Sequence, residues 1–357
     1  MENVLTKVTK VDDAEQLLEG MPVLIDDTSL AQCIDLTGKD LWGLLKSATR
    51  EDAGSPGSLY RKIHIPKKSG KVRVLYAPTG PLKAVQSKIR DRILDKAPKS
   101  STSVAYRKGV CPGDTAKAIA GAPVILQLDI KDFFPSILQS QVRKYFLSIG
   151  YGEYVSNLLG GLLCVKDGKR RFVPQGGTAS PMLANRIAEM LIDPAVEGEL
   201  PEGWCYLRYC DNLYIWPKKG TEYKAVSHKD LLSRIRQAIG LTGFSTHKGS
   251  IVPYYRRQKL LGLTVNVKAN MPRERYKLLR ACLYNCSKLG LESQLENSAA
   301  LGFETLGDRR ADVLRFKAFL SGILNYYKDY ITQHRYEQLK GWYLEASGEE
   351  EANSECS

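Results

Sequence analysis

Two short apolar segments of the chain each end in a carboxylate, and this feature constrains the fold more than any other. Residues 124–128 (VILQL) have the length and composition of a buried strand and are followed at once by Asp129. Residues 204–217 (WCYLRYCDNLYIWP) are aromatic and β-branched on both sides of Asp211 and Asn212, which is typical of a hairpin. A carboxylate at the end of a buried strand is costly unless a cation or a hydrogen-bond donor compensates it.

Two such carboxylates, if the fold brings them together, form a site for Mg²⁺, which prefers oxygen ligands and substrate phosphates. A pair of ions roughly 3.5–4 Å apart stabilises both the attacking and the leaving oxygen of a phosphoryl transfer. The alternative, for either aspartate taken alone, is that it caps a turn. Asp129 and Asp211 are therefore the first candidates for metal ligands.

The order of the expected elements mixes strands with helices, which favours an α+β fold. The helical stretches are 12–18, 29–34, 41–48, 81–94, 141–149, 231–239 and the segment from 272 to 344. Residues 176–195 are expected to begin as a glycine-rich turn and to continue as a long amphipathic helix. The extended stretches are a hairpin over 60–76, the strand 124–128, the hairpin 204–217 and a strand over 259–267. Residues 50–58 are rich in turn-forming residues and mark a boundary.

The charge of the chain indicates a polyanionic partner. The net charge is +13, and five acidic residues with no basic one lie in 345–357, so the rest of the chain carries +18. Each phosphate that Lys or Arg neutralises releases counterions, which makes binding to nucleic acid favourable. The alternative is a basic soluble protein without such a partner.

Composition also bears on location and on metal chemistry. No apolar run approaches the roughly 18–20 residues that a membrane helix needs, so we expect no membrane association. The polar start of the chain lacks the apolar region of a signal peptide, which favours the cytoplasm. The eight cysteines include no CxxC pair, so we expect reduced thiols and no zinc site.

Two further segments carry residues suited to a nucleotide. Residues 61–73 hold six basic side chains and no acidic one, and Gly70 supplies a turn, as a cationic hairpin folding over a triphosphate requires. A solvated charge run is the alternative. Gln175, Gly176 and Gly177 permit close approach of the backbone to a base or sugar and precede a helix N-terminus.

Five segments, taken in this order, resemble the motifs of reverse transcriptases, specifically the stand-alone bacterial, retron-like kind. They are IPKKSGKVRVLYAP at 65–78, DIKDFFPSI at 129–137, PQGGTASPMLAN at 174–185, YCDN at 209–212 and RRQKLLGLTVN at 256–266. They look like the fingers hairpin, the first catalytic motif, the loop that shapes the nucleotide pocket, the catalytic hairpin and the turn from palm to thumb. The resemblance spans about residues 58–335.

The resemblance assigns roles to individual residues. The catalytic residues are Asp129, Asp211 and Lys248, the last as a general acid near the leaving pyrophosphate. The ligands of two Mg²⁺ ions, or of Mn²⁺, are Asp129, Ile130, Asp211 and Asn212. The nucleotide-binding residues are Lys67, Arg73, Phe133, Phe134, Gln175 and Gly176. The nucleic-acid-binding residues are Lys68, Lys71, Arg256, Arg257, Lys259, Arg273, Lys277 and Arg280.

Two neighbouring phenylalanines are expected to face different ways. Period-2 alternation would turn one of Phe133 and Phe134 toward the core and the other toward the substrate. We favour Phe134 as the residue that, in the family, collides with a ribose 2′-hydroxyl and selects deoxynucleotides. The alternative for Phe134 is a core residue.

The segment 248–280 carries nine basic residues and one acidic residue. On the helix that begins near Pro272, Arg273, Lys277, Arg280 and Tyr284 follow the spacing of one face, and Leu279, Leu283 and Cys286 lie on another. A basic stripe of this kind suits the backbone of an RNA–DNA hybrid. A solvated helix face is the alternative.

The chain departs from the family pattern at Asn212, where a second aspartate is usual. An amide coordinates a metal more weakly than a carboxylate, so we expect an active enzyme with altered metal preference. Residues 114–119 (DTAKAI) lack the Asn and His of the retron element before the first catalytic strand, and Leu260, Leu261 and Gly262 replace its Val-Thr-Gly.

The expected architecture is a right-hand polymerase with a palm sheet, fingers and a helical thumb. The limits are 1–58 for an N-terminal helical extension, 59–265 for fingers and palm, 266–344 for the thumb and 345–357 for a disordered acidic tail. The resemblance implies DNA synthesis from dNTPs on a structured non-coding RNA that serves as template and primer. It also implies a branched RNA–DNA product (msDNA), a role in anti-phage defence and an effector protein as partner.

Two alternatives stay open at this stage. An abortive-infection or other defence reverse transcriptase could share these motifs and prime differently. A catalytically silent RNA-binding scaffold would keep the basic surfaces without the chemistry.

Overall fold

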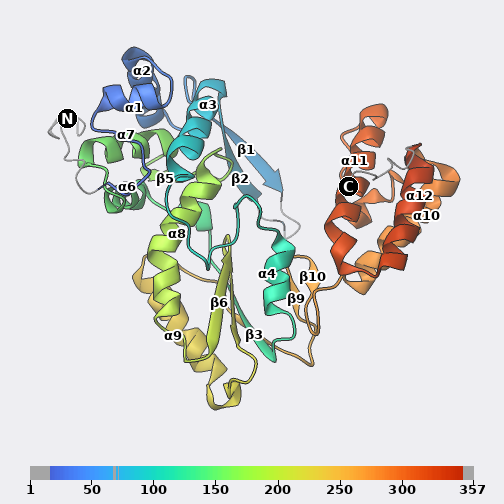
Figure 1. Ribbon diagram of the computed structural model, residues 1–357. Coiled ribbons are helices and arrows are strands. Elements are labelled where there is room, and N and C mark those ends of the chain that lie inside the picture. Colours follow the sequence, from blue (N-terminus) through green and yellow to red (C-terminus); the bar gives the residue numbers. More distant parts are fainter. Residues whose placement is uncertain (1–16, 67–69, 71, 349–357) are drawn as a thin grey trace. The chain divides into compact units, whose positions relative to one another are not determined.

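The computed structural model describes residues 17–66, 70 and 72–348, which form two compact units (Figure 1). The first unit contains the described residues up to Val110 together with Val124–Val252. The second contains Cys111–Pro123 and the described residues from Pro253 onward. The chain therefore leaves the first unit before the strand that ends in Asp129 and returns to it at Val124.

A four-stranded sheet forms the centre of the first unit. Its strand order is β6-β7-β3-β8, with β6 and β3 both antiparallel to β7. A separate antiparallel hairpin pairs β1 with β2, Tyr60 lying opposite Pro78. The strands are β1 (Tyr60–Pro66), β2 (Val72–Pro78), β3 (Val124–Asp129), β4 (Val165–Asp167), β5 (Arg170–Phe172), β6 (Trp204–Tyr209), β7 (Asn212–Pro217) and β8 (Ser250–Pro253).

Helices cover this sheet and extend the core of the first unit. They are α1 (Asp27–Cys33), α2 (Gly38–Arg50), α3 (Gly80–Ile89), α5 (Phe133–Ser136), α6 (Gln139–Ser148), α7 (Glu153–Leu163), α8 (Ser180–Glu197) and α9 (His228–Leu241), and α3 continues as a π-helical turn, Arg90–Leu94. Helices α8 and α9 lie beside the sheet in Figure 1, and their buried Ile187 and Ile235 belong to the same apolar core as Leu126 of β3. This core fixes the strands that carry the two carboxylates.

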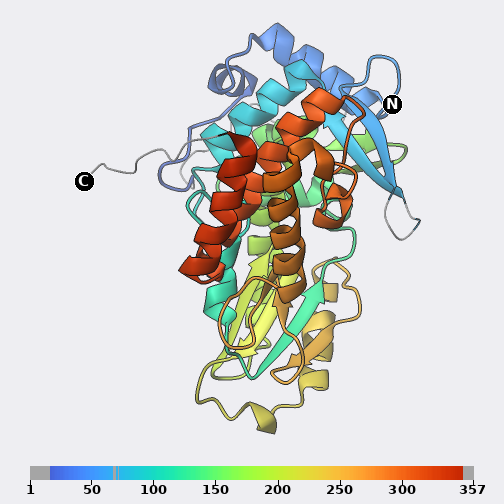
Figure 2. The same cartoon turned by 90° about the vertical axis from the view of Figure 1, so that its right-hand side faces the viewer.

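The second unit is mainly helical. It contains α4 (Pro112–Ile119), the short hairpin β9 (Lys259–Leu260) and β10 (Leu263–Thr264), and the helices α10 (Arg273–Leu289), α11 (Arg309–Tyr327) and α12 (Gln333–Ser347). Helices α10, α11 and α12 pack together (Figure 2). On α10, Leu279, Leu283 and Cys286 are buried, whereas Arg273, Lys277 and Arg280 are exposed. The predicted division of this helix into two faces is confirmed.

Helix α4 is held to the second unit by close packing around a glycine. A Cβ built on Gly113 would lie 1.4 Å from Tyr330 Oη, so only glycine fits there. Tyr330 is buried, and Lys117 Nζ lies 5.4 Å from the centre of its ring. The N–H of Gly121 donates to the carbonyl of Val265 at 2.9 Å. The segment just before β3 is therefore anchored outside the sheet.

The α+β class and most expected elements are confirmed, with three corrections. The strand predicted over 259–267 is instead the hairpin β9–β10, because Leu261 and Gly262 both have positive φ (48° and 84°) and turn the chain. Residues 345–347, predicted as the start of the disordered tail, belong to α12, which runs to Ser347. Phe133 and Phe134 lie in the helical turn α5 rather than on a strand, so period-2 alternation does not apply to them.

Two expectations about the ends and limits of the domains stay predictions. Residues 12–16 of the first expected helix and residues 349–357 of the acidic tail lie outside the described residues. The predicted domain limits place the thumb from residue 266, whereas the compact units divide between Val252 and Pro253.

In the described part of the chain, none of the helices has the length and apolar character needed to cross a membrane.

Gly113→Ala should destabilise the protein, because the new methyl group overlaps Tyr330 Oη and the buried ring has to move. We expect a loss of about 1–3 kcal/mol in the free energy of unfolding, measured by urea denaturation followed by circular dichroism. Gly322→Ala is the matched control: its Cβ meets nothing within 4 Å inside α11, and it should stabilise by about 0.5–1 kcal/mol. Equal effects of the two substitutions would contradict the packing described here.

Candidate active site

The register of two strands brings Asp129 and Asp211 together. Asp129 is the last residue of β3 and lies directly opposite Asn212, the first residue of β7, and Asp211 comes immediately before Asn212. The N–H of Ile130 donates to the carbonyl of Asp211 at 2.9 Å. Both carboxylates are half-buried. The pairing of these two central strands therefore fixes Asp129 and Asp211 at the same end of the sheet.

The electrostatics of this pair are unfavourable without a cation. Burial raises the pKa of Asp129, the negative charge of Asp211 raises it further, and His247 acts in the opposite direction. Two like charges held close together in a partly desolvated place disfavour the ionised form. Because a divalent cation would reverse this penalty, the site is suited to one.

The amide of Asn212 contacts the carboxylate that precedes it. Asn212 Nδ2 donates to Asp211 Oδ1 at 2.8 Å, a hydrogen bond that an aspartate at this position could not make. Among the described residues, no group of three or more His, Cys, Asp or Glu side chains is placed to hold a metal ion. The donor set is thus two carboxylates, one amide oxygen and nearby backbone carbonyls, all oxygen ligands that Mg²⁺ accepts.

The turn that carries Asp211 has a strained backbone, which contacts from neighbouring side chains stabilise. Cys210 has φ +59°, in the left-handed region that costs a non-glycine residue about 1–2 kcal/mol. Its Sγ lies 3.2 Å from Tyr106 Oη. The guanidinium of Arg208 donates to the carbonyl of Cys210 at 3.1 Å. These contacts hold the residue next to Asp211 in its turn conformation.

Arg208 itself belongs to a fully buried ion pair. It donates through Nε and Nη2 to the two carboxylate oxygens of Asp193, at 2.7 and 3.0 Å, and both side chains are almost completely buried. Tyr206 Oη donates to Asp193 Oδ1 at 2.9 Å. Asn185 accepts from Arg208 Nη1 at 2.8 Å and donates to the carbonyl of Ala105 at 2.6 Å. The network connects α8 to the strand that leads into the turn.

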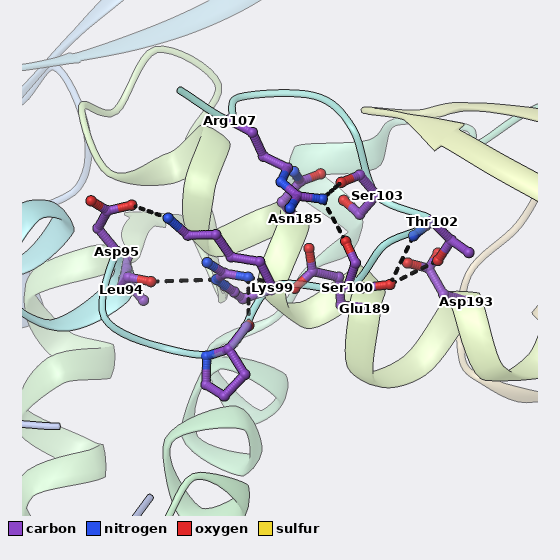
Figure 3. Close-up of polar contacts among 12 residues, drawn as sticks. Leu94, Asp95, Lys99, Ser100, Thr102, Ser103, Arg107, Asn185, Glu189 and Asp193 are labelled. Atoms are coloured by element: carbon purple, nitrogen blue, oxygen red, sulfur yellow. Dashed lines mark hydrogen bonds and ion pairs between the residues drawn. The ribbon is translucent and has the colours of Figure 1, made fainter. Parts of the chain in front are cut away.

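A loop before the sheet is clamped against the same helix (Figure 3). In Figure 3, Arg107 lies next to Asn185 of α8 and donates to the carbonyls of Ser100 and Ser103 at 2.7 and 3.1 Å. The backbones of Arg208 and this loop exchange hydrogen bonds, from Arg208 to the carbonyl of Thr102 at 2.8 Å and from Val104 to the carbonyl of Arg208 at 3.0 Å. This loop therefore supports the outer strand, β6, of the β6–β7 hairpin.

A cavity of about 500 Å³ lies in the first unit, between the β1–β2 hairpin and the start of α5. Asp129 and Asp211 are not among its lining residues, but Lys131, two residues after Asp129, is. Its lining includes two predicted nucleotide-binding residues, Arg73 and Gln175. It also includes Lys131 and Arg170, two cationic side chains that the sequence reasoning missed. Lys131 could have been predicted from the sequence, because it is the basic residue inside the motif DIKDFF. Arg170 lies in no such motif, so the sequence did not point to it.

An acidic residue and a tyrosine organise one wall of this cavity. Asp167 accepts hydrogen bonds from Lys62 Nζ and from Tyr76 Oη, both at 2.8 Å. Burial alone would raise the pKa of Asp167, but these two hydrogen bonds lower it below its ordinary value. Burial and the bond to Asp167 both raise the pKa of Tyr76. The wall therefore holds a carboxylate that stays ionised and a tyrosine that stays neutral.

The glycine-rich loop contacts the β1–β2 hairpin through its backbone. The N–H of Tyr76 donates to the carbonyl of Gln175 at 2.8 Å, and Gly176 has φ +109° with its Cβ position 3.2 Å from the carbonyl oxygen of Tyr76. Only glycine combines this backbone conformation with so close an approach. Gly176 lies at the back of the loop and is not among the residues that line the cavity.

A buried glutamine, missed at the sequence level, ties this loop to the core. Gln86 donates to Tyr60 Oη at 2.7 Å and to the carbonyl of Leu162 at 3.0 Å, and it accepts from the N–H of Thr178 at 3.0 Å. Its signal is its position: it falls on the apolar helical face defined by Leu82, Val85 and Ile89. A polar residue on such a face must find internal partners.

The other predicted residues of the first unit fall in three places. Phe133 is 3% exposed and packs against Phe244, with their ring centroids 6.5 Å apart, whereas Phe134 is half-buried against Phe133; neither lines the cavity. Lys248 is exposed, one residue beyond His247, whose N–H donates to the carbonyl of Asp129 at 2.8 Å. Lys67, Lys68 and Lys71 lie outside the described residues.

The predicted nucleic-acid-binding residues of the second unit are all exposed: Arg256, Arg257, Lys259, Arg273, Lys277 and Arg280. Arg257 forms an ion pair with Glu274 of α10, which raises the pKa of Arg257 and lowers that of Glu274 to about 2.

Comparison with known proteins identifies the family. The model of the protein family described as "Reverse transcriptase (RNA-dependent DNA polymerase)" matches residues 65–265, more than half of the chain. The retron Ec86 reverse transcriptase of Escherichia coli is 32% identical over 242 residues, covering 67% of this chain and 73% of that protein. The chain belongs to the bacterial retron-type reverse transcriptases. It is thus an RNA-directed DNA polymerase, and the expected family is confirmed.

A second relative spans more of this reverse transcriptase. The retron Mx65 reverse transcriptase of Myxococcus xanthus is 27% identical over 332 residues, covering 89% of this chain and 71% of that protein. Among solved structures, telomerase from Candida albicans is similar at a TM-score of 0.41 and 12% identity, over 88% of this chain and 63% of that chain. That structural likeness is too distant to add to the sequence matches.

Asp211→Asn should lower the pKa of Asp129, because it removes the like charge that adds to the effect of burial. In metal-free buffer the raised pKa means that the folded protein binds more protons than the unfolded chain, so stability falls as pH rises through that pKa. Asp211→Asn should reduce this loss of stability. Carboxyl-carbon NMR titration of Asp129 checks the shift, with exposed Glu202→Gln as the control. An unchanged Asp129 pKa would show that the two carboxylates do not interact.

Replacing one member of the buried Arg208–Asp193 pair should be costly, because it leaves the other charge uncompensated. We expect Arg208→Met or Asp193→Leu to lower the free energy of unfolding by about 3–5 kcal/mol. The double variant should recover most of this loss and still polymerise poorly, because the carbonyl of Cys210 has lost its donor. Chemical denaturation and primer extension measure the two effects separately. A double variant as active as the wild type would argue against a positioning role.

Proposed function

We propose that this reverse transcriptase copies RNA into DNA by two-metal-ion nucleotidyl transfer centred on Asp129 and Asp211. The observation that carries this proposal is the β3–β7 register, which places Asp129 opposite Asn212 and so brings Asp129 and Asp211 to the same end of the two central strands. The raised pKa of Asp129 indicates that the pair is incomplete without positive charge.

The donor set fits divalent cations. Asp129 and Asp211 would hold them together with the carbonyl of Ile130 and the amide oxygen of Asn212. When bound, Mg²⁺ ions stabilise the attacking 3′-oxygen and the leaving oxygen of the triphosphate. Because Asn212 contributes no charge, the site carries one negative charge fewer than a pair of adjacent aspartates would supply, and we expect Mn²⁺ to serve as an alternative.

The cavity is the proposed place of the incoming dNTP. Arg73, with Lys67 from the same hairpin, would bind the triphosphate, and Lys131 and Arg170 add positive charge on the cavity lining. Gln175 and Gly176 would steady the templating base. Phe134, and not the buried Phe133, is the candidate for excluding a ribose 2′-hydroxyl.

The remaining assignments concern proton transfer and the grip on nucleic acid. Lys248 is exposed close to the end of β3 and is the candidate general acid for the leaving pyrophosphate. The exposed face of α10 formed by Arg273, Lys277 and Arg280 would contact the phosphates of an RNA–DNA hybrid. Lys68, Lys71, Arg256, Arg257 and Lys259 are the other proposed phosphate contacts.

The proposed template and primer is a structured non-coding RNA, and the proposed product is a branched RNA–DNA molecule made in the cytoplasm as part of anti-phage defence with an effector protein. The retron relatives support this assignment. Sequencing the nucleic acid that co-purifies with the full chain tests it. A branched RNA–DNA hybrid is expected, whereas free or protein-linked DNA would favour a defence reverse transcriptase with different priming.

Asn212→Asp should shift the metal preference of the polymerase. A second carboxylate adds a charged oxygen ligand and removes the hydrogen bond from Asn212 to Asp211, so activity at low Mg²⁺ should rise relative to activity with Mn²⁺. Primer extension on an RNA template, at matched concentrations of each metal, measures the ratio. Asp211→Ala should abolish extension, and Glu202→Ala, an exposed acidic residue, should leave it unchanged. Extension by Asp211→Ala at the wild-type rate would overturn the proposed mechanism.

A further inference from the structure

Two consecutive tyrosines of the second unit are exposed side by side. Tyr254 and Tyr255 are 61% and 74% exposed, and their rings meet edge to face with centroids 5.7 Å apart. In the described part of the chain they are the only two consecutive large apolar residues that are both exposed. Aromatic rings left in water this way give up the stabilisation that burial would bring.

The backbone beneath these rings is held firmly. The N–H of Tyr254 donates to the carbonyl of Pro123 at 2.9 Å. Asn266 Nδ2 donates to the carbonyls of Tyr254 and Arg256, at 2.7 and 2.6 Å, and Asn266 Oδ1 accepts from the N–H of Gln258 at 3.0 Å. The rings therefore stand on an ordered segment, and binding a ligand there would cost little conformational entropy.

The charge around the rings is positive. Arg256 follows them directly and is exposed, and Lys268 is exposed two residues after Asn266, whose amide donates to the carbonyl of Tyr254. Arg257 is engaged with Glu274, so its charge is balanced within the unit. Aromatic rings next to cations form the usual surface for unpaired nucleic acid, where bases stack on the rings and phosphates meet the cations.

We propose that Tyr254 and Tyr255 are a stacking platform for unpaired bases of an RNA strand, with Arg256 beside them contacting a phosphate. This inference rests on the proposed function, in which RNA is the template. The DNA strand pairs with the template as it is made, so the bases left without a partner belong to the RNA. A second protein is a poorer occupant, because the apolar surface here is confined to two rings among charged residues.

The test compares stacking-deficient and stacking-competent variants of the full chain. Tyr254→Leu/Tyr255→Leu should weaken binding of a short, unstructured, fluorescently labelled RNA by about tenfold or more, measured by fluorescence anisotropy. Tyr254→Phe/Tyr255→Phe keeps the rings and should bind as the wild type does. Tyr254 and Tyr255 are both exposed, so neither double variant removes a core side chain.

An abasic RNA of the same length separates stacking from charge. The wild type should bind abasic RNA as weakly as the leucine variant binds normal RNA, and the leucine substitutions should not weaken abasic binding further. Leu306→Ala and Leu314→Ala, which remove other exposed apolar side chains of this unit, should leave binding unchanged. Wild-type affinity of the leucine variant for normal RNA, or an equal loss with abasic RNA, would overturn the proposal.

Primer extension on a preformed RNA–DNA hybrid keeps this inference distinct from the proposed polymerase mechanism. The leucine variant should extend such a primer at the wild-type rate when the template has no unpaired overhang beyond a few nucleotides. If the wild type fails to extend any primer, the proposed polymerase mechanism is contradicted. The RNA-binding comparison of the wild type with the leucine variant still tests whether Tyr254 and Tyr255 stack on bases.

Discussion

The antiparallel pairing of β3 with β7 is the constraint on which the rest of the site depends. Pairing Asp129 with Asn212 places Asp211 next to Asp129, so a shift of one residue along either strand would turn one carboxylate away. The register is in turn fixed by apolar side chains, such as Leu126 and Leu213, that enter the common core. The fold thus holds two like charges close together. The burial of neighbouring apolar side chains offsets the electrostatic repulsion between the two carboxylates, and a bound cation would remove that repulsion.

Polar contacts in the interior transmit this register to the loops that carry function. Arg208 joins α8 to the turn before Asp211, and Gln86 joins α3 to the glycine-rich loop. Both residues are buried, and both bond to backbone groups as well as side chains. Positions of this kind do not touch the substrate but determine where the residues that do will lie.

The sequence alone predicted the parts of the fold that follow from local patterning. The hairpin at 204–217, the strand ending at Asp129 and the two faces of α10 follow from alternation and helical spacing, and the structure contains them. The prediction was wrong where tertiary contacts determine the local conformation. A positive φ at Leu261 divides the predicted strand 259–267, and Phe133 and Phe134 lie in the helical turn α5 rather than in an extended segment. Arg170 and Gln86 were missed because their partners are distant in sequence.

Iron-directed backbone cleavage tests whether Asp129 and Asp211 share a divalent cation. Fe²⁺ bound in place of Mg²⁺ generates hydroxyl radicals with ascorbate and peroxide, and these cut the peptide chain near the metal. If the two aspartates share the ion, cuts should occur next to both Asp129 and Asp211, be suppressed by excess Mg²⁺ and be absent from the Asp129→Asn variant. Cuts at only one of the two segments, or cuts that persist in excess Mg²⁺, would contradict a shared ion.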